Sequence, residues 1–269
     1  MANLRSMAES TMKPVLVEHA GAIATVTMNR PQRLNALNRS MWEQLSASMH
    51  TLSAQDEVRC VVLRGAGDTA FAAGADIGEF GIERADSGQA SAYGALIHET
   101  MQSIARCRHP TVALIKGACI GGGLEIAAMC DLRICGSSSR FGVPINRLGL
   151  TMGYGELQGL LALAGRAVTL EILLEGRVFD ADEAYAKGLV NRVVADEHVE
   201  REAYATAERI AAGAPLVARW HKRFVERLTV LARLSAEEWQ EGYACFDTED
   251  CREGVDAFLA KRKPQFKAR

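Results

Sequence analysis

The fold is decided by the stretch Lys116-Gly-Ala-Cys-Ile-Gly121-Gly-Gly-Leu-Glu125-Ile-Ala-Ala-Met129. The apolar run before it predicts a buried strand over residues 111–115, and the glycine trio is followed by a short helix that is apolar on nearly every side. Such a helix begins with free backbone N–H groups and a positive dipole end, which stabilise negative charge on a ligand oxygen. The stretch is not a P-loop, because it lacks Gly-Lys-Ser/Thr.

Glu125 interrupts this otherwise apolar helix. Carboxylates are rarely buried without a partner. Two interpretations are open: a structural glutamate paired with an arginine, or a carboxyl group whose pKa is raised by desolvation so that it can transfer a proton. We favour the second.

Two other glycine-rich segments precede it. Gly65-Ala-Gly-Asp-Thr-Ala70 fits the GxGxxA dinucleotide pattern, but no long amphipathic helix begins directly after it, as that motif requires. The run Phe71-Ala-Ala-Gly-Ala-Asp-Ile77 has small residues whose backbone a ligand can approach closely. A loop that merely packs tightly would have the same composition, so this segment alone does not decide between the two.

Strand-like and helix-like patterns alternate over the first two thirds of the chain, which indicates an α/β fold with strands covered on their faces. A helix should run from the caps Asn38 and Ser40 to about Ala54. From about residue 196 to 263 the pattern is helical, with a break at 211–215. The expected strands are 15–18, 23–28, 60–64, 111–115, 132–135 and 190–194.

Composition excludes several classes of protein. The 269 residues are 48% hydrophobic and 24% charged with a net charge of −2, without the basic excess of nucleic-acid or membrane-surface proteins. Seven cysteines form no CxxC pair and the histidines show no metal-ligand spacing, which favours a reducing, cytoplasmic location and no metal site. No run of about 18 apolar residues occurs, and residues 1–12 are expected to be a disordered lead-in.

Four segments together resemble the enoyl-CoA hydratase/isomerase (crotonase) family over almost the whole chain. They are Arg30-Pro-Gln-Arg-Leu-Asn-Ala-Leu37, Phe71-Ala-Ala-Gly-Ala-Asp-Ile77, Gly121-Gly-Gly-Leu-Glu125 and Ala257-Phe-Leu-Ala-Lys-Arg-Lys-Pro-Gln-Phe266. The resemblance implies a spiral of ββα units over residues 13–195 and a C-terminal helical trimerisation region over 196–269. It also implies a homotrimer or hexamer, in which the large apolar residues of the last segment (Trp220, Phe224, Trp239, Phe246, Phe258) bury against neighbouring subunits.

The resemblance also implies the roles of individual residues. The backbone N–H groups of Ala75 and Gly122 would bind the thioester oxygen, and Glu125 would be the acid/base group. The substrate and its coenzyme A moiety would contact Arg33, Leu34, Ala36, Ala73, Asp76, Ile77 and Gly121. Such an enzyme needs no cofactor beyond the CoA carried by its acyl-CoA or enoyl-CoA substrate.

One position departs from the family pattern. Family hydratases carry a second glutamate twenty residues after the first, whereas this chain reads Phe141-Gly-Val-Pro-Ile145-Asn146. Ile145 cannot transfer a proton, so both proton transfers of a hydration would fall to Glu125 unless Asn146, Tyr154 or Glu156 takes part.

We expect hydration or dehydration of an enoyl-CoA. The missing glutamate keeps open isomerisation, decarboxylation or thioester hydrolysis, and also a non-catalytic CoA-binding scaffold. The RNA-binding role of some relatives is disfavoured, because the helix from Ser40 to Ala54 contains no lysine or arginine.

Overall fold

The computed structural model describes residues 13–229, 235–241 and 243–269. The expected lead-in over residues 1–12 and the side chain of Trp239 lie outside the described part. Most of the strands belong to a six-stranded sheet in the order β1-β2-β3-β5-β7-β10. Its first pair is antiparallel and its other pairs are parallel. The strands are β1 (Val15–Ala20), β2 (Ile23–Met28), β3 (Cys60–Gly65), β5 (Thr111–Ile115), β7 (Leu132–Gly136) and β10 (Arg192–Val194).

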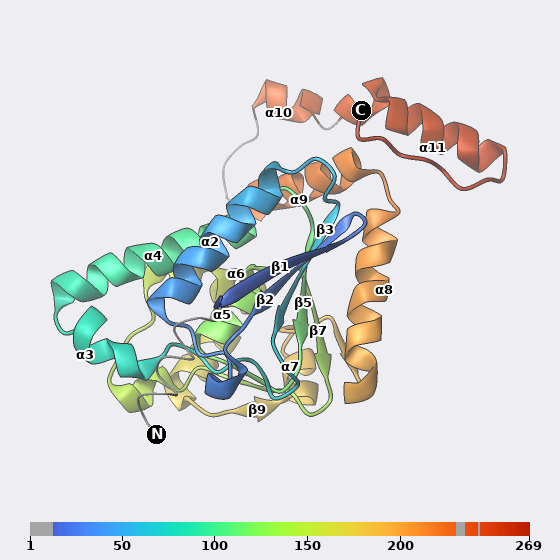
Figure 1. Ribbon diagram of the computed structural model, residues 1–269. Helices are drawn as coiled ribbons and strands as arrows, with labels where there is room; N and C mark the ends of the chain where they lie inside the picture. Colours follow the sequence, from blue (N-terminus) through green and yellow to red (C-terminus); the bar gives the residue numbers. More distant parts are fainter. Residues whose placement is uncertain (1–12, 230–234, 242) are drawn as a thin grey trace.

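A second sheet has four short strands in the order β4-β6-β8-β9. They are β4 (Ala70–Ala72), β6 (Ala118–Ile120), β8 (Arg140–Gly142) and β9 (Phe179–Asp180). From β3 to β8 consecutive strands alternate between the sheets, so β3 and β4, β5 and β6, and β7 and β8 each form one turn of a spiral. Figure 1 shows the two sheets and the helices that cover them. This arrangement confirms the expected mixed α/β fold.

Helices fill the connections and the C-terminal part. The α-helices are α2 (Arg39–Ala54), α3 (Phe80–Glu83), α4 (Ser87–Ala105), α5 (Gly122–Met129), α6 (Tyr154–Glu175), α7 (Ala181–Ala186), α8 (Val199–Ala211), α9 (Pro215–Thr229), α10 (Ala236–Glu241) and α11 (Glu249–Leu259). Short 3₁₀ turns are η1 (Pro31–Arg33), η2 (Ile77–Glu79), η3 (Pro144–Leu148), η4 (Asp196–His198) and η5 (Ala244–Asp247). The predicted start of α2 is confirmed, because the Asn38 side chain accepts a hydrogen bond from the Met41 N–H at 3.0 Å.

The side chains of β3 belong alternately to two apolar clusters, one on each face of the six-stranded sheet. Val61 and Leu63 point into the larger core, whereas Cys60 and Val62 point into a smaller cluster with Val199 of α8. Because successive side chains of a strand face opposite ways, a strand covered on both faces is apolar throughout. Figure 1 shows α8 lying along the sheet on the side of this smaller cluster.

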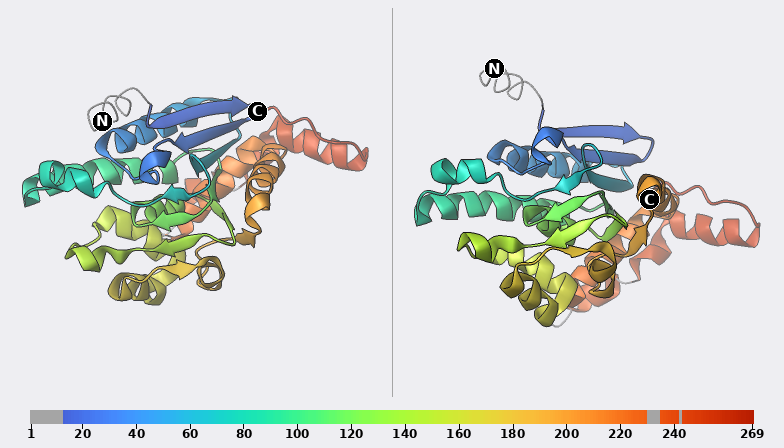
Figure 2. Two further views of the ribbon diagram at one scale, coloured as in Figure 1. Left: turned by 60° about the horizontal axis from the view of Figure 1, so that its bottom comes forward. Right: turned by 90° about the horizontal axis from the view of Figure 1, so that it is seen from below.

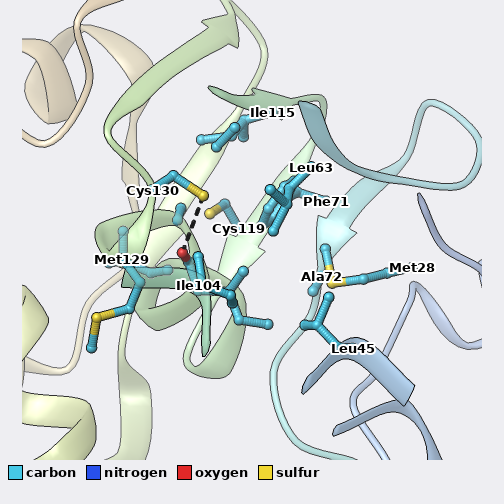
Figure 3. Packing of buried hydrophobic residues seen from close by; sticks show 14 of the residues in the cluster. Met28, Leu45, Leu63, Phe71, Ala72, Ile104, Ile115, Cys119, Met129 and Cys130 are labelled. Atoms are coloured by element: carbon cyan, nitrogen blue, oxygen red, sulfur yellow. Dashed lines mark hydrogen bonds between the residues drawn. The ribbon is translucent and has the colours of Figure 1, made fainter. Parts of the chain in front are cut away.

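The larger core surrounds α5 and supports the site. Figure 3 shows side chains of this core, among them Phe71 of β4, Ile104 of α4 and Cys119 of β6, with Cys130 at the end of α5. The Cys130 thiol donates to the Ile126 carbonyl at 3.5 Å, within the last turn of α5. This dense packing fixes the helix that carries Glu125.

Within the described residues, one helix, α6, is long and apolar enough to cross a membrane by length and composition alone. It is interrupted at Gly165, where φ is 71°, and its first part packs against α5. Many core helices meet the same criterion. Exposed Leu170 and Leu174 on its second part are free to contact another protein surface.

The described C-terminal region is mostly helical, as predicted, and the expected break falls between α8 and α9. Its last helix, α11, ends at Leu259, and residues 260–269 are not helical. Figure 2 shows α11 projecting away from the sheets in two views. Phe246 and Phe258 are exposed, whereas Trp220 and Phe224 are half-buried. Their burial against neighbouring subunits therefore stays a prediction.

Candidate active site

The site forms where three neighbouring strands end. β4, β6 and β8 run parallel, so the segments that follow them meet at one edge of the small sheet. A cavity of about 380 Å³ lies at this edge. It is lined by Trp42, Ala73, Gly74, Ala75, Ile77, Phe80, Arg84, Ala90, Gly94, Ile97, Ile120, Gly121, Gly122, Glu125, Val143, Pro144, Ile145, Leu148, Leu150, Thr151, Gly153 and Glu156.

Two glycines allow the segments after β4 and β6 to approach closely. Gly74 has φ +99°, and a Cβ added there would lie 3.2 Å from the Ile120 carbonyl oxygen and 3.8 Å from the Gly122 nitrogen. Gly121 has φ +51°, which also disfavours residues with side chains. The run of small residues therefore does more than fill a loop, because it brings the Ala75 and Gly122 backbones to the same cavity.

The N–H groups of Ala75 and Gly122 are available to a ligand. The backbone groups of the residues on either side of Ala75 already form hydrogen bonds. The Leu37 N–H donates to the Gly74 carbonyl at 2.8 Å, and the Asp76 N–H donates to the Leu37 carbonyl at 2.9 Å. Neither Ala75 nor Gly122 donates its own N–H to a described residue. Gly122 is the first residue of α5, where backbone donors have no partner within the helix. Both donors can therefore serve an oxygen atom in the cavity.

Glu125 lies one turn into α5 and lines the cavity with only 6% of its surface exposed. It makes no ion pair and no side-chain hydrogen bond with a described residue, so the interpretation as a structural glutamate paired with arginine finds no support. Burial, and secondly the negative charge of Glu156, raise its pKa to about 8, while the Arg84 charge opposes the shift. Glu125 is therefore predominantly protonated at neutral pH and can supply a proton.

Glu156 is the second carboxylate of the cavity. It lies in the first turn of α6 and accepts a hydrogen bond from the Gly153 N–H at 2.6 Å, which holds it at the helix N-terminus. Ile145 also lines the cavity, at the position where the resemblance expects a glutamate. Of the three polar residues left open by the sequence, Tyr154 and Asn146 are outside the lining, and Asn146 donates instead to the Leu174 carbonyl at 2.9 Å.

The residues expected to contact the substrate and CoA divide into two groups. Ala73, Ile77 and Gly121 line the cavity. Arg33, Leu34, Ala36 and Asp76 do not line it, although the Ala73 N–H donates to the Leu34 carbonyl at 3.0 Å and Asp76 forms an ion pair with Arg30 at 3.0 Å. The contact with Ala73 places Leu34 next to the lining, and the role of all four residues in holding CoA stays a prediction.

Sequence reasoning missed Arg84, which follows the short helix α3 and lines the cavity. It carries no motif, and only the fold brings residue 84 next to residue 125. The predicted absence of a metal site stays untested. In the described ranges, no group of three or more histidine, cysteine, aspartate or glutamate side chains could hold a metal ion.

The chain is similar to known proteins over almost its whole length. The sequence model of the enoyl-CoA hydratase/isomerase family matches residues 18–269. A protein named probable enoyl-CoA hydratase from Rhizobium meliloti is 39% identical over 95% of this chain and 98% of that protein. A short-chain-enoyl-CoA hydratase from Clostridium acetobutylicum is 34% identical over 93% of this chain and 95% of its own length.

Solved structures show the same fold. An enoyl-CoA hydratase/carnithine racemase from Magnetospirillum magneticum superimposes with a TM-score of 0.94 at 50% identity, covering 96% of this chain and 97% of that one. A Bacillus anthracis enoyl-CoA hydratase gives 0.89 at 30% identity over 95% of this chain and all of its own. The chain has the crotonase fold, and it belongs to the enoyl-CoA hydratase/isomerase family of lyase- and isomerase-type enzymes that act on acyl-CoA or enoyl-CoA substrates.

Proposed function

We propose that the protein adds water reversibly across the α,β double bond of an enoyl-CoA thioester. The thioester oxygen accepts hydrogen bonds from the Ala75 and Gly122 N–H groups. Attack by water at the β-carbon moves electrons onto this oxygen, and two fixed donors stabilise the resulting enolate without reorganisation. The names of the relatives from Rhizobium meliloti and Clostridium acetobutylicum support hydration as the reaction.

The observation that carries the proposal is that two carboxyl groups share one cavity and interact. Burial, and secondly the charge of Glu156, raise the pKa of Glu125 to about 8, so Glu125 holds a proton at neutral pH. Hydration needs one group that accepts a proton from water and another that gives a proton to the α-carbon. Carboxyl groups whose environments separate their protonation states suit these two roles.

The proton balance follows from this assignment. Glu156 accepts a proton from water as the water oxygen bonds to the β-carbon. Glu125 then gives its proton to the α-carbon, and the enolate returns to a thioester. The pair ends with the proton on Glu156 instead of Glu125, and exchange with solvent restores the starting state. Glu156 thereby supplies the function that Ile145 cannot.

Double-bond isomerisation is the second candidate, and the apolar Ile145 favours it. A shift of a double bond moves one proton between two carbons, so a single carboxyl group beside the oxyanion donors is sufficient. No observation on the described residues specifically favours decarboxylation, thioester hydrolysis or a non-catalytic scaffold.

The test compares Glu125→Gln and Glu156→Gln with two substrates, a short 2-enoyl-CoA for hydration and a 3-enoyl-CoA for isomerisation. In Glu156→Gln the new side-chain amide oxygen can still accept the Gly153 N–H, so this variant keeps the helix cap. Each variant should lower kcat for hydration by at least about 10²-fold, the usual scale of general acid–base catalysis. Glu197→Gln, on the exposed turn η4, is the matched control.

Hydration should also weaken as the pH rises through about 8, because Glu125 then loses the proton that it must donate. A rate that increases over this range would show that Glu125 acts as the base. Full hydration activity in Glu156→Gln, with loss in Glu125→Gln, would contradict the two-carboxyl mechanism and assign both proton transfers to Glu125. Turnover of the 3-enoyl-CoA without hydration of the 2-enoyl-CoA would favour isomerisation instead.

A further inference from the structure

Arg84 places a positive charge in the wall of the cavity. The proposed hydration mechanism assigns no role to this charge. Its guanidinium lies over the Phe80 ring at 4.6 Å and over the Tyr93 ring at 4.2 Å from the ring centroids. These aromatic contacts hold the planar group in one orientation. The Tyr93 hydroxyl also interacts with the guanidinium through a hydrogen bond. The guanidinium nitrogens that remain can donate further hydrogen bonds.

One edge of this guanidinium lacks a partner. Nε and Nη2 of Arg84 are both buried, and neither donates a hydrogen bond to a described residue. No ion pair among the described residues includes Arg84. The carboxylates nearest in sequence are used by Arg39: Glu79 accepts from its N–H at 2.9 Å and Glu83 from its Nε at 2.8 Å. Buried donors left without partners are destabilising, so a structure that keeps two of them on one edge is suited to a ligand.

Arg84 lies in the part of the cavity that an acyl group would occupy. It shares the lining with Glu125 and is close enough for its charge to act on that residue. The walls around it are apolar, with Phe80, Ile97 and Leu148 among them. A simple fatty acyl chain would pack against these apolar walls, but it would offer no hydrogen-bond acceptor to the guanidinium edge.

We propose that Arg84 is a specificity residue that binds a carboxylate on the acyl group, so that the substrate is the CoA monothioester of an unsaturated dicarboxylic acid. This inference rests on the proposed function and names its substrate class. Nε and Nη2 lie on the same edge of the guanidinium, and a carboxylate accepts from these two nitrogens in a side-on bidentate pair. The pairing also offsets the desolvation of a carboxylate in an apolar cavity.

The protonated state of Glu125 is compatible with this substrate. A neutral carboxyl group does not repel an incoming carboxylate and does not compete for the guanidinium. The remaining negative charge, on Glu156, is held at the N-terminus of α6 through the Gly153 N–H.

The experiment measures binding first, with saturated thioesters that cannot react. Glutaryl-CoA is compared with 5-methylhexanoyl-CoA, in which an isopropyl group replaces the carboxylate at nearly the same size. Affinities are measured by calorimetry for the unmodified protein, Arg84→Met, Arg84→Lys and the control Arg201→Met on the exposed face of α8. Circular dichroism and the melting temperature establish that each variant folds.

The unmodified protein and Arg201→Met should bind glutaryl-CoA at least about tenfold more tightly than 5-methylhexanoyl-CoA, the scale of a charge-assisted bidentate pair. Arg84→Met should reverse the preference, and Arg84→Lys should retain part of it. Equal affinities in the unmodified protein, or a ratio unchanged in folded Arg84→Met, would overturn the inference. If Arg84→Met does not fold, the ratio measured on the unmodified protein still decides.

Turnover of the corresponding 2-enoyl thioesters separates this inference from the proposed function. Preferential binding of glutaryl-CoA without hydration of either unsaturated thioester would overturn the proposed function and leave the carboxylate site standing. Hydration of both thioesters with equal efficiency, and no binding preference, would overturn the site and leave the function standing.

Discussion

Glu125→Gln should make the folded protein more stable while it removes activity. The carboxyl group of Glu125 has its pKa raised from 4.5 to about 8 by burial, with the Glu156 charge as the second cause. Between these two pH values the folded state keeps a proton that the unfolded chain releases. Stability therefore decreases as the pH rises through this window, since the folded state binds the extra proton.

The size of the effect follows from the width of the window. Each pKa unit corresponds to about 1.4 kcal/mol, so the full shift is worth on the order of 5 kcal/mol above pH 8. Close to pH 4 Glu125 is protonated in the unfolded chain as well, so its effect on the free energy of unfolding disappears. Glutamine has the same size and no titratable proton, so the variant should lack this pH dependence.

The assay is denaturant unfolding of both proteins at pH 5 and at pH 8. The stability of Glu125→Gln relative to the unmodified protein should increase by roughly 3 kcal/mol between these two values. Glu197→Gln, which is exposed, should follow the unmodified protein at both. A difference between Glu125→Gln and the unmodified protein that is the same at pH 5 and pH 8 would refute the raised pKa, and with it the assignment of Glu125 as the proton donor.

Three other perturbations test the site and the assembly. Gly122→Pro should lower kcat for hydration by about 10²–10³-fold relative to Gly122→Ala. Both substitutions add a Cβ against Leu37, but only proline deletes the N–H group that binds the oxyanion. Equal rates for the two variants would show that this N–H group is not a donor to the oxyanion. Ile145→Glu should raise kcat for hydration of a short 2-enoyl-CoA, since it places a further carboxyl group in the cavity wall, and a rate below that of the unmodified protein would show that the cavity cannot use it. Light scattering at micromolar concentration should give the mass of a trimer or hexamer, because Phe246, Phe258 and Leu174 are exposed in one chain; a monomeric mass would contradict this.

Local sequence signals were sufficient for most of the fold. Asn38 caps α2 as predicted, and the apolar run Cys-Val-Val-Leu-Arg from Cys60 forms β3, which extends one residue further to Gly65. The prediction that no long helix begins directly after Gly65-Ala-Gly-Asp-Thr-Ala70 is confirmed, because this segment leads into β4. The short strands of the second sheet were not predicted individually, since two or three residues give too little periodicity to recognise.

The candidate site was predictable only where its residues are close in sequence. Gly122 and Glu125 belong to one helix, so their spacing alone places them one turn apart. Ala75 faces the same cavity because β4 pairs with β6. The resemblance implied that Ala75 and Gly122 bind one oxygen, whereas periodicity along the chain did not indicate this. Arg84 directly follows α3 and Glu156 lies in the first turn of α6, and both line the cavity that contains Glu125. No local sequence pattern encodes contacts between elements so far apart in the chain.

The position of Glu156 shows why a missing motif residue is a weak argument against an activity. Ile145 follows β8 and Glu156 begins α6, yet both line the cavity that contains Glu125. A carboxyl group acts through its distance to the reacting carbon and through its charge, and neither depends on the element that carries it. Glu156 is close enough for its charge to add to the effect of burial in raising the pKa of Glu125. In the proposed mechanism, the loss of the family glutamate at position 145 therefore changes only the direction from which the second proton transfer occurs, because Glu125 and Glu156 supply the two carboxyl groups.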